Sequence, residues 1–186
     1  MTLFEYLAAA LTLVLSLAVV RLVAGLPSAI LPDRRYWVHL VAVASLFLAV
    51  VGYFWAFWSY REVDWTFPRF LLVLTGPVLV HFLAATIIPG SPDDVESWRE
   101  FYYSIRPRYF IAWVVYALWL ICTSILVLDM PLIHPARFIS LGVLVFGAVG
   151  ASSSSPRVHA GLAVGAIAAS VGVVFVLLVE PGSLAN

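Results

Sequence analysis

Four polar side chains within otherwise apolar segments are the residues of this chain best suited to chemistry. Arg21, His39, His81 and His159 each lie in a different hydrophobic run, near the same border if the runs alternate across a membrane. Charged and imidazole groups are costly inside a bilayer and often mark a binding site or pathway. The residues therefore predict a cavity open to one side, with a positive character that suits a small anion or polar solute. The alternative is that they are border residues beside water, with Arg21 extending its side chain to the interface.

A proline in the same run as His81 adds to this prediction. Pro77 precedes His81 by one helical turn. Proline lacks a backbone N–H, so the carbonyl of Val73 loses its helical partner, and interrupted membrane helices often border binding sites. A simple kink, with His81 bonded to a neighbouring helix, fits the sequence equally well. His39 and His81 could also ligate a haem from adjacent helices, whereas a metal site that adds His159 would lack a carboxylate within the membrane.

Composition and motif content argue against several classes of enzyme and binding protein. All ten basic residues are arginine, which excludes a Schiff-base lysine and a Walker A lysine. The chain has neither a GxSxG nor an HExxH motif, and Cys122 is its single cysteine. It also has no basic patch for nucleic acid. We therefore expect no catalytic residues, no metal site and no nucleic-acid partner.

The elements that must position these residues are membrane-spanning helices. Of the 186 residues, 63% are hydrophobic and 11% are charged, whereas soluble domains are usually about 45–50% apolar and 25% charged. The mean hydropathy is +1.05. Hydrophobic runs predict six spans, and together they form a single all-α transmembrane domain over residues 1–186; the expected spans are 3–26, 36–60, 67–88, 109–128, 138–151 and 158–179.

The third connection is expected to contain a short interfacial helix. Ser91 is a suitable N-cap, and Pro92 follows at the first helical position. Apolar side chains then recur at helical spacing and form one face, namely Val95, Trp98, Phe101, Tyr102 and Ile105. Such a helix would lie on the cytoplasmic surface of the membrane.

Arginines and aromatic residues predict the orientation. Arginines are more numerous in the connections after the first, third and fifth runs, which the positive-inside rule places in the cytoplasm, so both termini would lie outside. At the opposite border, Trp55, Trp58 and Trp65 are typical of an aromatic belt. Their rings could instead stack on a flat ligand such as a quinone.

Stripes of small residues predict how the helices pack. Residues 158–179 carry Gly161, Gly165, Ala168 and Gly172 along one side, and residues 36–60 carry a similar stripe. Small residues allow helices to approach closely in lipid. We expect these contacts to lie within the chain, and the alternative is an oligomer contact.

Several short motifs resemble those of a family of small six-span bacterial membrane proteins without an assigned activity. They cover most of residues 36–160 and include Tyr36-Trp37-Val38-His39, Asp64-Trp65-Thr66-Phe67, Tyr102-Tyr103 and Arg157-Val158-His159. The resemblance implies a bacterial inner-membrane protein and transfers no function.

Three function classes remain open at this point. The first is a small transport or channel-like protein with a polar cavity that opens to the cytoplasm. The second is an accessory or scaffolding subunit, either a homo-oligomer or part of a larger membrane complex. The third is a redox protein that binds haem or quinone.

Overall fold

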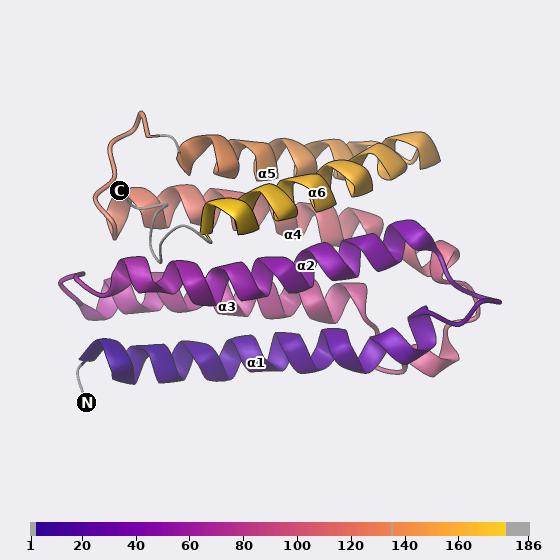
Figure 1. The fold of residues 1–186 in the computed structure, drawn as a ribbon, viewed down its shortest axis with the longest axis horizontal. Coiled ribbons are helices and arrows are strands. Elements are labelled where there is room, and N and C mark those ends of the chain that lie inside the picture. The colour runs from indigo at the N-terminus through magenta and orange to yellow at the C-terminus, as the bar shows by residue number, and fades with distance from the viewer. Residues whose placement is uncertain (1–2, 135, 178–186) are drawn as a thin grey trace.

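The computed structural model describes residues 3–134 and 136–177, apart from the side chains of residues 136 and 173–177, and this part of the chain is helical with irregular connections. Long helices run side by side and are joined at alternate ends (Figure 1). The elements are α1 (Leu3–Ala29), α2 (Trp37–Ala56), η1 (Phe57–Tyr60), α3 (Phe67–Ile87), η2 (Pro92–Asp94), α4 (Trp98–Leu126), α5 (Ala136–Ser152) and α6 (Pro156–Leu177).

Four of the helical segments are long and apolar enough to cross a membrane. They are Leu3–Ala29, Trp37–Tyr60, Phe67–Asp94 and Trp98–Leu126, with mean hydropathies from 2.0 to 2.4. The all-helical fold and its suitability for a bilayer are therefore confirmed. α5 has 17 residues, at the lower limit of about 17–25 for a span, so the count of six spans stays a prediction. The last two residues of the expected span 158–179 lie outside the described part.

The separate interfacial helix does not form, and the predicted start of the fourth span at Tyr109 is wrong. α4 begins at Trp98 and continues without a break through Pro107. Its N-cap is Ser97, whose hydroxyl accepts a hydrogen bond from the Glu100 backbone N–H at 3.4 Å. Ser91 precedes only the single turn η2. A proline was therefore tolerated where we expected a helix boundary.

The start of the apolar face of the expected interfacial helix is buried within the protein. Trp98 is 0% exposed and Tyr102 is 2% exposed. The Trp98 indole donates a hydrogen bond to the Ser28 carbonyl at 3.2 Å. The Ser28 hydroxyl in turn donates to the Pro92 carbonyl at 2.7 Å. These bonds tie the start of α4 and the turn η2 to the end of α1.

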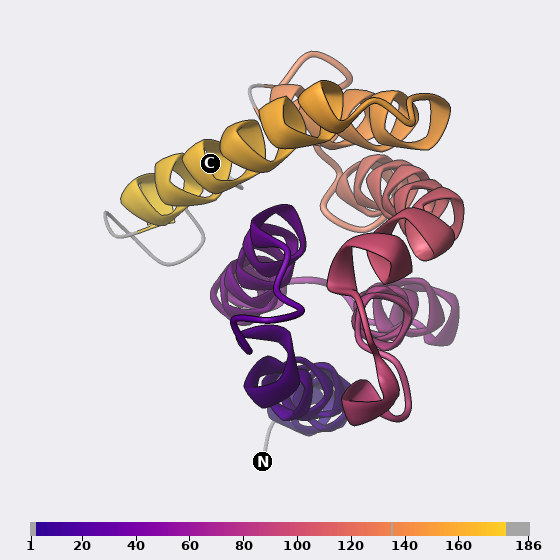
Figure 2. The ribbon, with the colours of Figure 1, turned by 90° about the vertical axis from the view of Figure 1, so that its right-hand side faces the viewer.

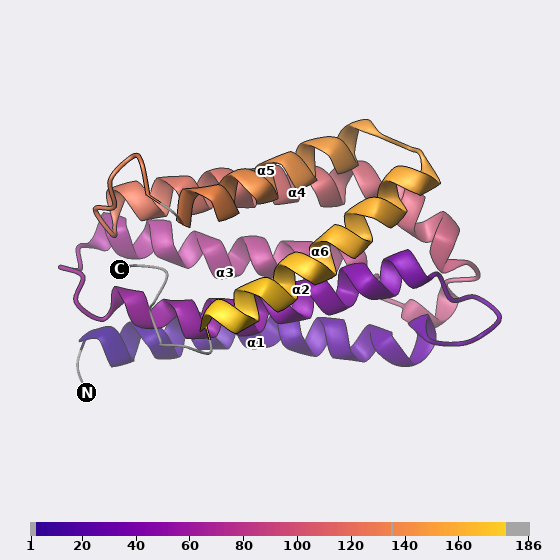
Figure 3. The same ribbon diagram turned by 45° about the horizontal axis from the view of Figure 1, so that its top comes forward.

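The helices form two groups that meet along α2 and α4. α1, α2, α3 and α4 surround a common interior, seen end-on in Figure 2, while α5 lies along α4. α6 leaves α5 and crosses obliquely over α2, as Figure 3 shows.

The glycines that permit close helix contacts are not those of the predicted stripe. A Cβ atom at Gly161, Gly165 or Gly172 would have no neighbour within 4 Å, so these α6 positions face open space. A Cβ at Gly150 would overlap the ring of Phe110. The close approach therefore joins α5 to α4, and the stripe on α6 makes a hollow where we expected a tight contact.

Gly150→Ala is expected to lower the stability of the protein by about 1–3 kcal/mol, because the added methyl group overpacks the contact with Phe110. Gly142→Ala on the same helix is the matched control, because its Cβ would meet nothing within 4 Å. Unfolding of both variants in detergent by titration with sodium dodecyl sulfate measures the difference. Equal stabilities would contradict the close packing of α5 on α4.

Candidate functional site

Two of the four predicted polar residues come together at one end of the bundle. The loops that join α1 to α2, α3 to α4 and α5 to α6 all lie at this end (Figure 1). His159 is 0% exposed at the start of α6. Its Nδ1 atom lies 2.9 Å from the Tyr102 hydroxyl and its Nε2 atom 2.7 Å from the Ser153 carbonyl. His39 and His159 both pack edge-on against the ring of Tyr102.

The partners of His159 determine its tautomer. A carbonyl oxygen only accepts hydrogen bonds, so Nε2 carries the proton that is shared with Ser153. In the neutral ring Nδ1 then accepts from the Tyr102 hydroxyl. The Arg106 guanidinium also donates to the Ser153 carbonyl. This network fixes the start of α6 and the α5–α6 loop against α4.

Tyr102→Phe is expected to destabilise the protein by about 1–3 kcal/mol, because it leaves Nδ1 of His159 buried without a donor. Tyr103→Phe is the control: it removes a hydroxyl that is paired with Tyr36 at 3.2 Å in a half-buried position, and its cost should stay near 0.6 kcal/mol. Thermal unfolding in detergent distinguishes the two variants. A larger loss for Tyr103→Phe would contradict the assigned role of the Tyr102–His159 pair.

His39 is enclosed by aromatic rings. It is 0% exposed, and neither of its ring nitrogens has a hydrogen-bond partner. Its ring centroid lies 4.5 Å from that of Trp98 and 6.2 Å from that of Phe101. Immediately before α2, burial and then the hydrogen bond with Tyr103 raise the pKa of the Tyr36 hydroxyl above its ordinary value.

The other two polar residues have different surroundings. The Arg21 Nε donates a hydrogen bond to the Ile88 carbonyl at 3.0 Å, so Arg21 caps the end of α3. His81 is half-buried on α3, and its Nδ1 atom is enclosed without a partner. None of the four predicted residues lines either of two hollows in the bundle, one between α2, α4, α5 and α6 and the other beside Arg137. The shared depth inferred from the sequence therefore does not bring them around one cavity in the described part of the chain.

Pro77 interrupts the hydrogen bonding of α3 as the sequence predicts, and aromatic side chains compensate. The Tyr53 hydroxyl donates to the Val73 carbonyl, which Pro77 leaves without a helical partner, at 3.3 Å. The Trp119 indole donates to the adjacent Leu72 carbonyl at 2.7 Å. Tyr53 and Trp119 stack with centroids 5.9 Å apart. Side chains of α2 and α4 thus donate hydrogen bonds to the carbonyls of the interrupted segment.

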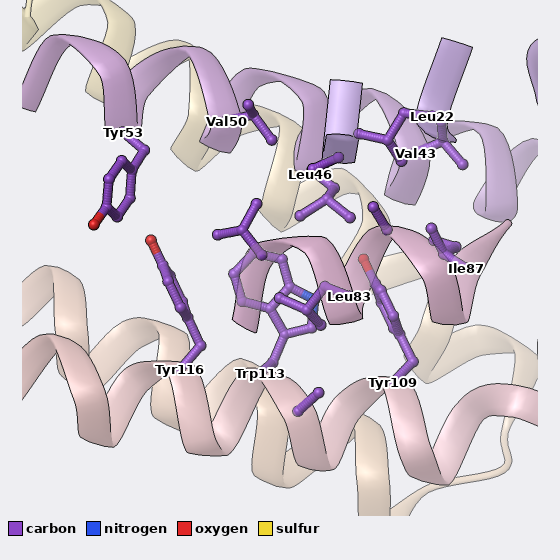
Figure 4. Close-up of a cluster of buried hydrophobic side chains, with 14 of the residues drawn as sticks. Leu22, Val43, Leu46, Val50, Tyr53, Leu83, Ile87, Tyr109, Trp113 and Tyr116 are labelled. Atoms are coloured by element: carbon purple, nitrogen blue, oxygen red, sulfur yellow. The ribbon is translucent and has the colours of Figure 1, made fainter. Parts of the chain in front are cut away.

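An apolar cavity of about 920 Å³ lies between α2, α4, α5 and α6. This volume falls in the range of about 300–1,000 Å³ that is usual for small-molecule sites. Aromatic rings from α4 form one wall, and small residues of α2 and α6 leave the space; the lining includes Ser45, Ala49, Gly52, Tyr102, Tyr109, Trp113, Tyr116, Trp119, Phe146, Gly161, Gly165 and Gly172. Figure 4 shows Tyr109, Trp113 and Tyr116 pointing from α4 toward α2.

Two hydrogen-bonding groups in the lining of this apolar cavity have no protein partner. They are the hydroxyl of Ser45 and the indole N–H of Trp113, and each residue is 8% exposed. A buried donor without an acceptor costs about 1–3 kcal/mol. Both polar atoms are enclosed by protein, so neither is open to the apolar cavity. The sequence indicates this wall through the helical spacing of Tyr102, Tyr109, Trp113 and Tyr116. The prediction of a ring-stacking ligand instead concerned the aromatic residues at the other border.

The tryptophans of the predicted belt lie largely outside the cavity wall. Trp55 is 44% exposed and Trp58 is 49% exposed, as expected for rings at a membrane border. The Arg61 guanidinium lies 5.5 Å from the centroid of the Trp58 ring. Trp65 is half-buried and stacks on Tyr60 with centroids 6.2 Å apart. The rings that face the cavity are instead those of α4.

Comparisons of the chain with models of protein families, with curated proteins and with solved structures find no match. The resemblance to small six-span bacterial membrane proteins therefore stays a prediction. A candidate metal site, defined as three or more His, Cys, Asp or Glu side chains within reach of one ion, does not occur among the described residues. The apolar cavity is therefore the feature from which a function can be inferred.

Proposed function

We propose that this chain is an integral membrane protein that binds one lipid-like molecule in the apolar cavity. The observation that carries the proposal is an apolar cavity of about 920 Å³ with aromatic walls, within helices suited to a bilayer. An acyl or isoprenoid chain would fill the apolar space. This replaces a polar solute as the ligand, while a role in moving or presenting a ligand within the membrane remains part of the proposal.

The environment we propose is the inner membrane of a bacterium. α5 and α6 would complete six spans, with both termini outside. The support for this orientation is the arginine-rich end of the bundle. Arg34 lies in the α1–α2 loop, Arg99 and Arg157 lie in the first turns of α4 and α6, and Arg106 lies in the third turn of α4. Attachment of reporter enzymes to either terminus would test the orientation.

The main competitor for the apolar cavity is a helix from a partner protein, as an accessory subunit would require. The cavity volume of about 920 Å³ lies within the range of about 300–1,000 Å³ that is usual for small-molecule sites. A small lipophilic molecule therefore fits the apolar cavity, and the binding experiment below distinguishes it from a partner helix.

Quenching of tryptophan fluorescence tests the proposed function. The full chain in mild detergent is titrated with a phospholipid whose acyl chains carry bromine, which quenches tryptophans in contact with it. We expect saturable quenching near one lipid per protein, with a smaller amplitude in Trp113→Phe than in Trp55→Phe. Trp55 is exposed on the lipid side and serves as the matched control. Quenching that never saturates, or that does not depend on Trp113, would contradict a defined site.

A quinone is the second candidate ligand, favoured by the stacked rings of Tyr116 and Trp119, whose centroids are 5.4 Å apart. Haem at His39 and His81 has less support, because the ring of His39 is already packed against Trp98. An absorbance spectrum of the purified protein, before and after dithionite, separates these cases. A quinone would change the ultraviolet spectrum on reduction, and haem would give a Soret band that shifts.

A further inference from the structure

A second, smaller hollow of about 140 Å³ adjoins the apolar cavity at the end of the bundle opposite His159. The two share Ala56, Tyr60, Leu120 and Ile139 in their linings. The lining of the smaller hollow is also mostly apolar, but several polar side chains contribute to it, namely Ser59, Thr123, Ser124, His134, Arg137 and Ser140. An amphipathic molecule that spans both hollows would place its chain in the larger one and its head beside these side chains at the border.

The charge in this smaller hollow is positive. Arg137 donates hydrogen bonds to the Ser124 hydroxyl at 2.5 Å and to the Pro131 and Ile121 carbonyls at 3.0 and 3.4 Å. All of these acceptors are neutral. The carboxylate in the adjoining loop, Asp129, lies 3.5 Å from the Arg69 guanidinium. Within the described residues, the charge of Arg137 is thus solvated by neutral oxygens and is not matched by an anion.

The position of Arg137 in the fold adds to its preference for an anion. It lies in the first turn of α5, where the free backbone N–H groups carry a partial positive charge. Guanidinium groups bind phosphate oxygens with charge-assisted hydrogen bonds. Hydroxyl groups of Ser59 and Ser140 line the same space and could donate as well.

From these contacts we propose that the molecule bound in the apolar cavity is an anionic lipid whose phosphate binds at Arg137. This inference rests on the proposed function and names the class of ligand. The phosphate would occupy the smaller hollow, and one chain would extend past Tyr60 into the apolar cavity. One anionic lipid would fill both hollows. A free phosphate would leave the apolar cavity empty, and a neutral lipid would place no charge beside Arg137.

The test compares two probes with identical acyl chains, phosphatidylglycerol and diacylglycerol, which differ by the phosphate-containing head. Binding to the full chain in neutral detergent is measured by native mass spectrometry. We expect at least fivefold tighter binding of phosphatidylglycerol and a weaker preference at high salt, since salt screens exposed charge. Arg137→Gln should remove the preference while diacylglycerol still binds, and Arg137→Lys should retain most of it. Arg69→Gln, a cation at the same end that lines neither hollow, should leave it unchanged.

The outcomes separate the two proposals. An equal preference for phosphatidylglycerol in Arg137→Gln and wild type would overturn the inference but leave lipid binding intact. Failure of both lipids to bind the wild-type protein would overturn the proposed function itself. Binding of inorganic phosphate in the absence of binding by either lipid would identify a free-anion site and reject the lipid. Should Arg137→Gln not fold, the salt dependence and Arg137→Lys still decide: a preference insensitive to salt contradicts the role of the charge.

Discussion

Filling the apolar cavity with two phenylalanines is expected to weaken ligand binding about a hundredfold, which is about 2.7 kcal/mol. The variant Gly161→Phe/Gly165→Phe places two rings one helical turn apart on α6. Both glycines line the cavity, and a Cβ at either position would meet nothing within 4 Å. The rings therefore enter space that a ligand would need without displacing a packed neighbour. Binding of the brominated phospholipid measures the loss.

The control for this variant adds the same rings on the outside of the same helix. Val164 and Val171 are 59% and 46% exposed and do not line the apolar cavity. Val164→Phe/Val171→Phe should therefore bind lipid as the wild type does. If the control loses binding equally, the effect belongs to α6 as a whole. If Gly161→Phe/Gly165→Phe binds normally, the ligand does not occupy the apolar cavity, and the proposed function is wrong.

The class of fold followed from composition, because no soluble chain of this length could bury so much apolar surface. The boundaries of the helices were less predictable. The apolar face of the expected interfacial helix ended at Ile105 and the next helix was expected to begin at Tyr109, yet α4 passes through Pro107 between them. Proline disfavours a helix interior only by the loss of one bond and a local clash. The burial of Trp98 and Tyr102, on the part of α4 that precedes Pro107, supplied compensating contacts. A sequence does not reveal which contacts will form.

The candidate site was predictable only in part. Depth along a helix can be counted from sequence, so His39 and His159 were correctly expected near the same end. The direction in which each side chain points across the bundle depends on how the helices are arranged around one another. Arg21 consequently binds the end of α3, while His159 binds Tyr102. The apolar cavity was missed for the same reason, since the α6 glycines were read as contact residues although α6 crosses α2 obliquely.

The largest loss of stability is expected for Trp119→Ala, at about 3–5 kcal/mol. Trp119 is 6% exposed. Its ring packs so closely on Gly76 that a Cβ atom at that position would overlap the ring. Its indole also supplies the hydrogen bond to the Leu72 carbonyl, one residue before the carbonyl freed by Pro77. Truncation therefore removes apolar packing and a donor at the interrupted part of α3. Denaturation by sodium dodecyl sulfate, with Trp55→Ala as the lipid-facing control, measures the difference.

The contribution of the interrupted helix can be separated from packing by a double-mutant cycle. Tyr53→Phe removes only the hydroxyl that donates to the Val73 carbonyl, and in membrane proteins such a bond is worth about 0.6 kcal/mol on average. Pro77→Ala restores a backbone N–H that can donate to the same carbonyl. Tyr53→Phe should therefore cost less in the Pro77→Ala background than in the wild type, whereas Trp119→Ala should stay costly in both. An unchanged cost of Tyr53→Phe would show that its hydroxyl does not compensate for Pro77, and the aromatic wall would then stabilise α3 through packing alone.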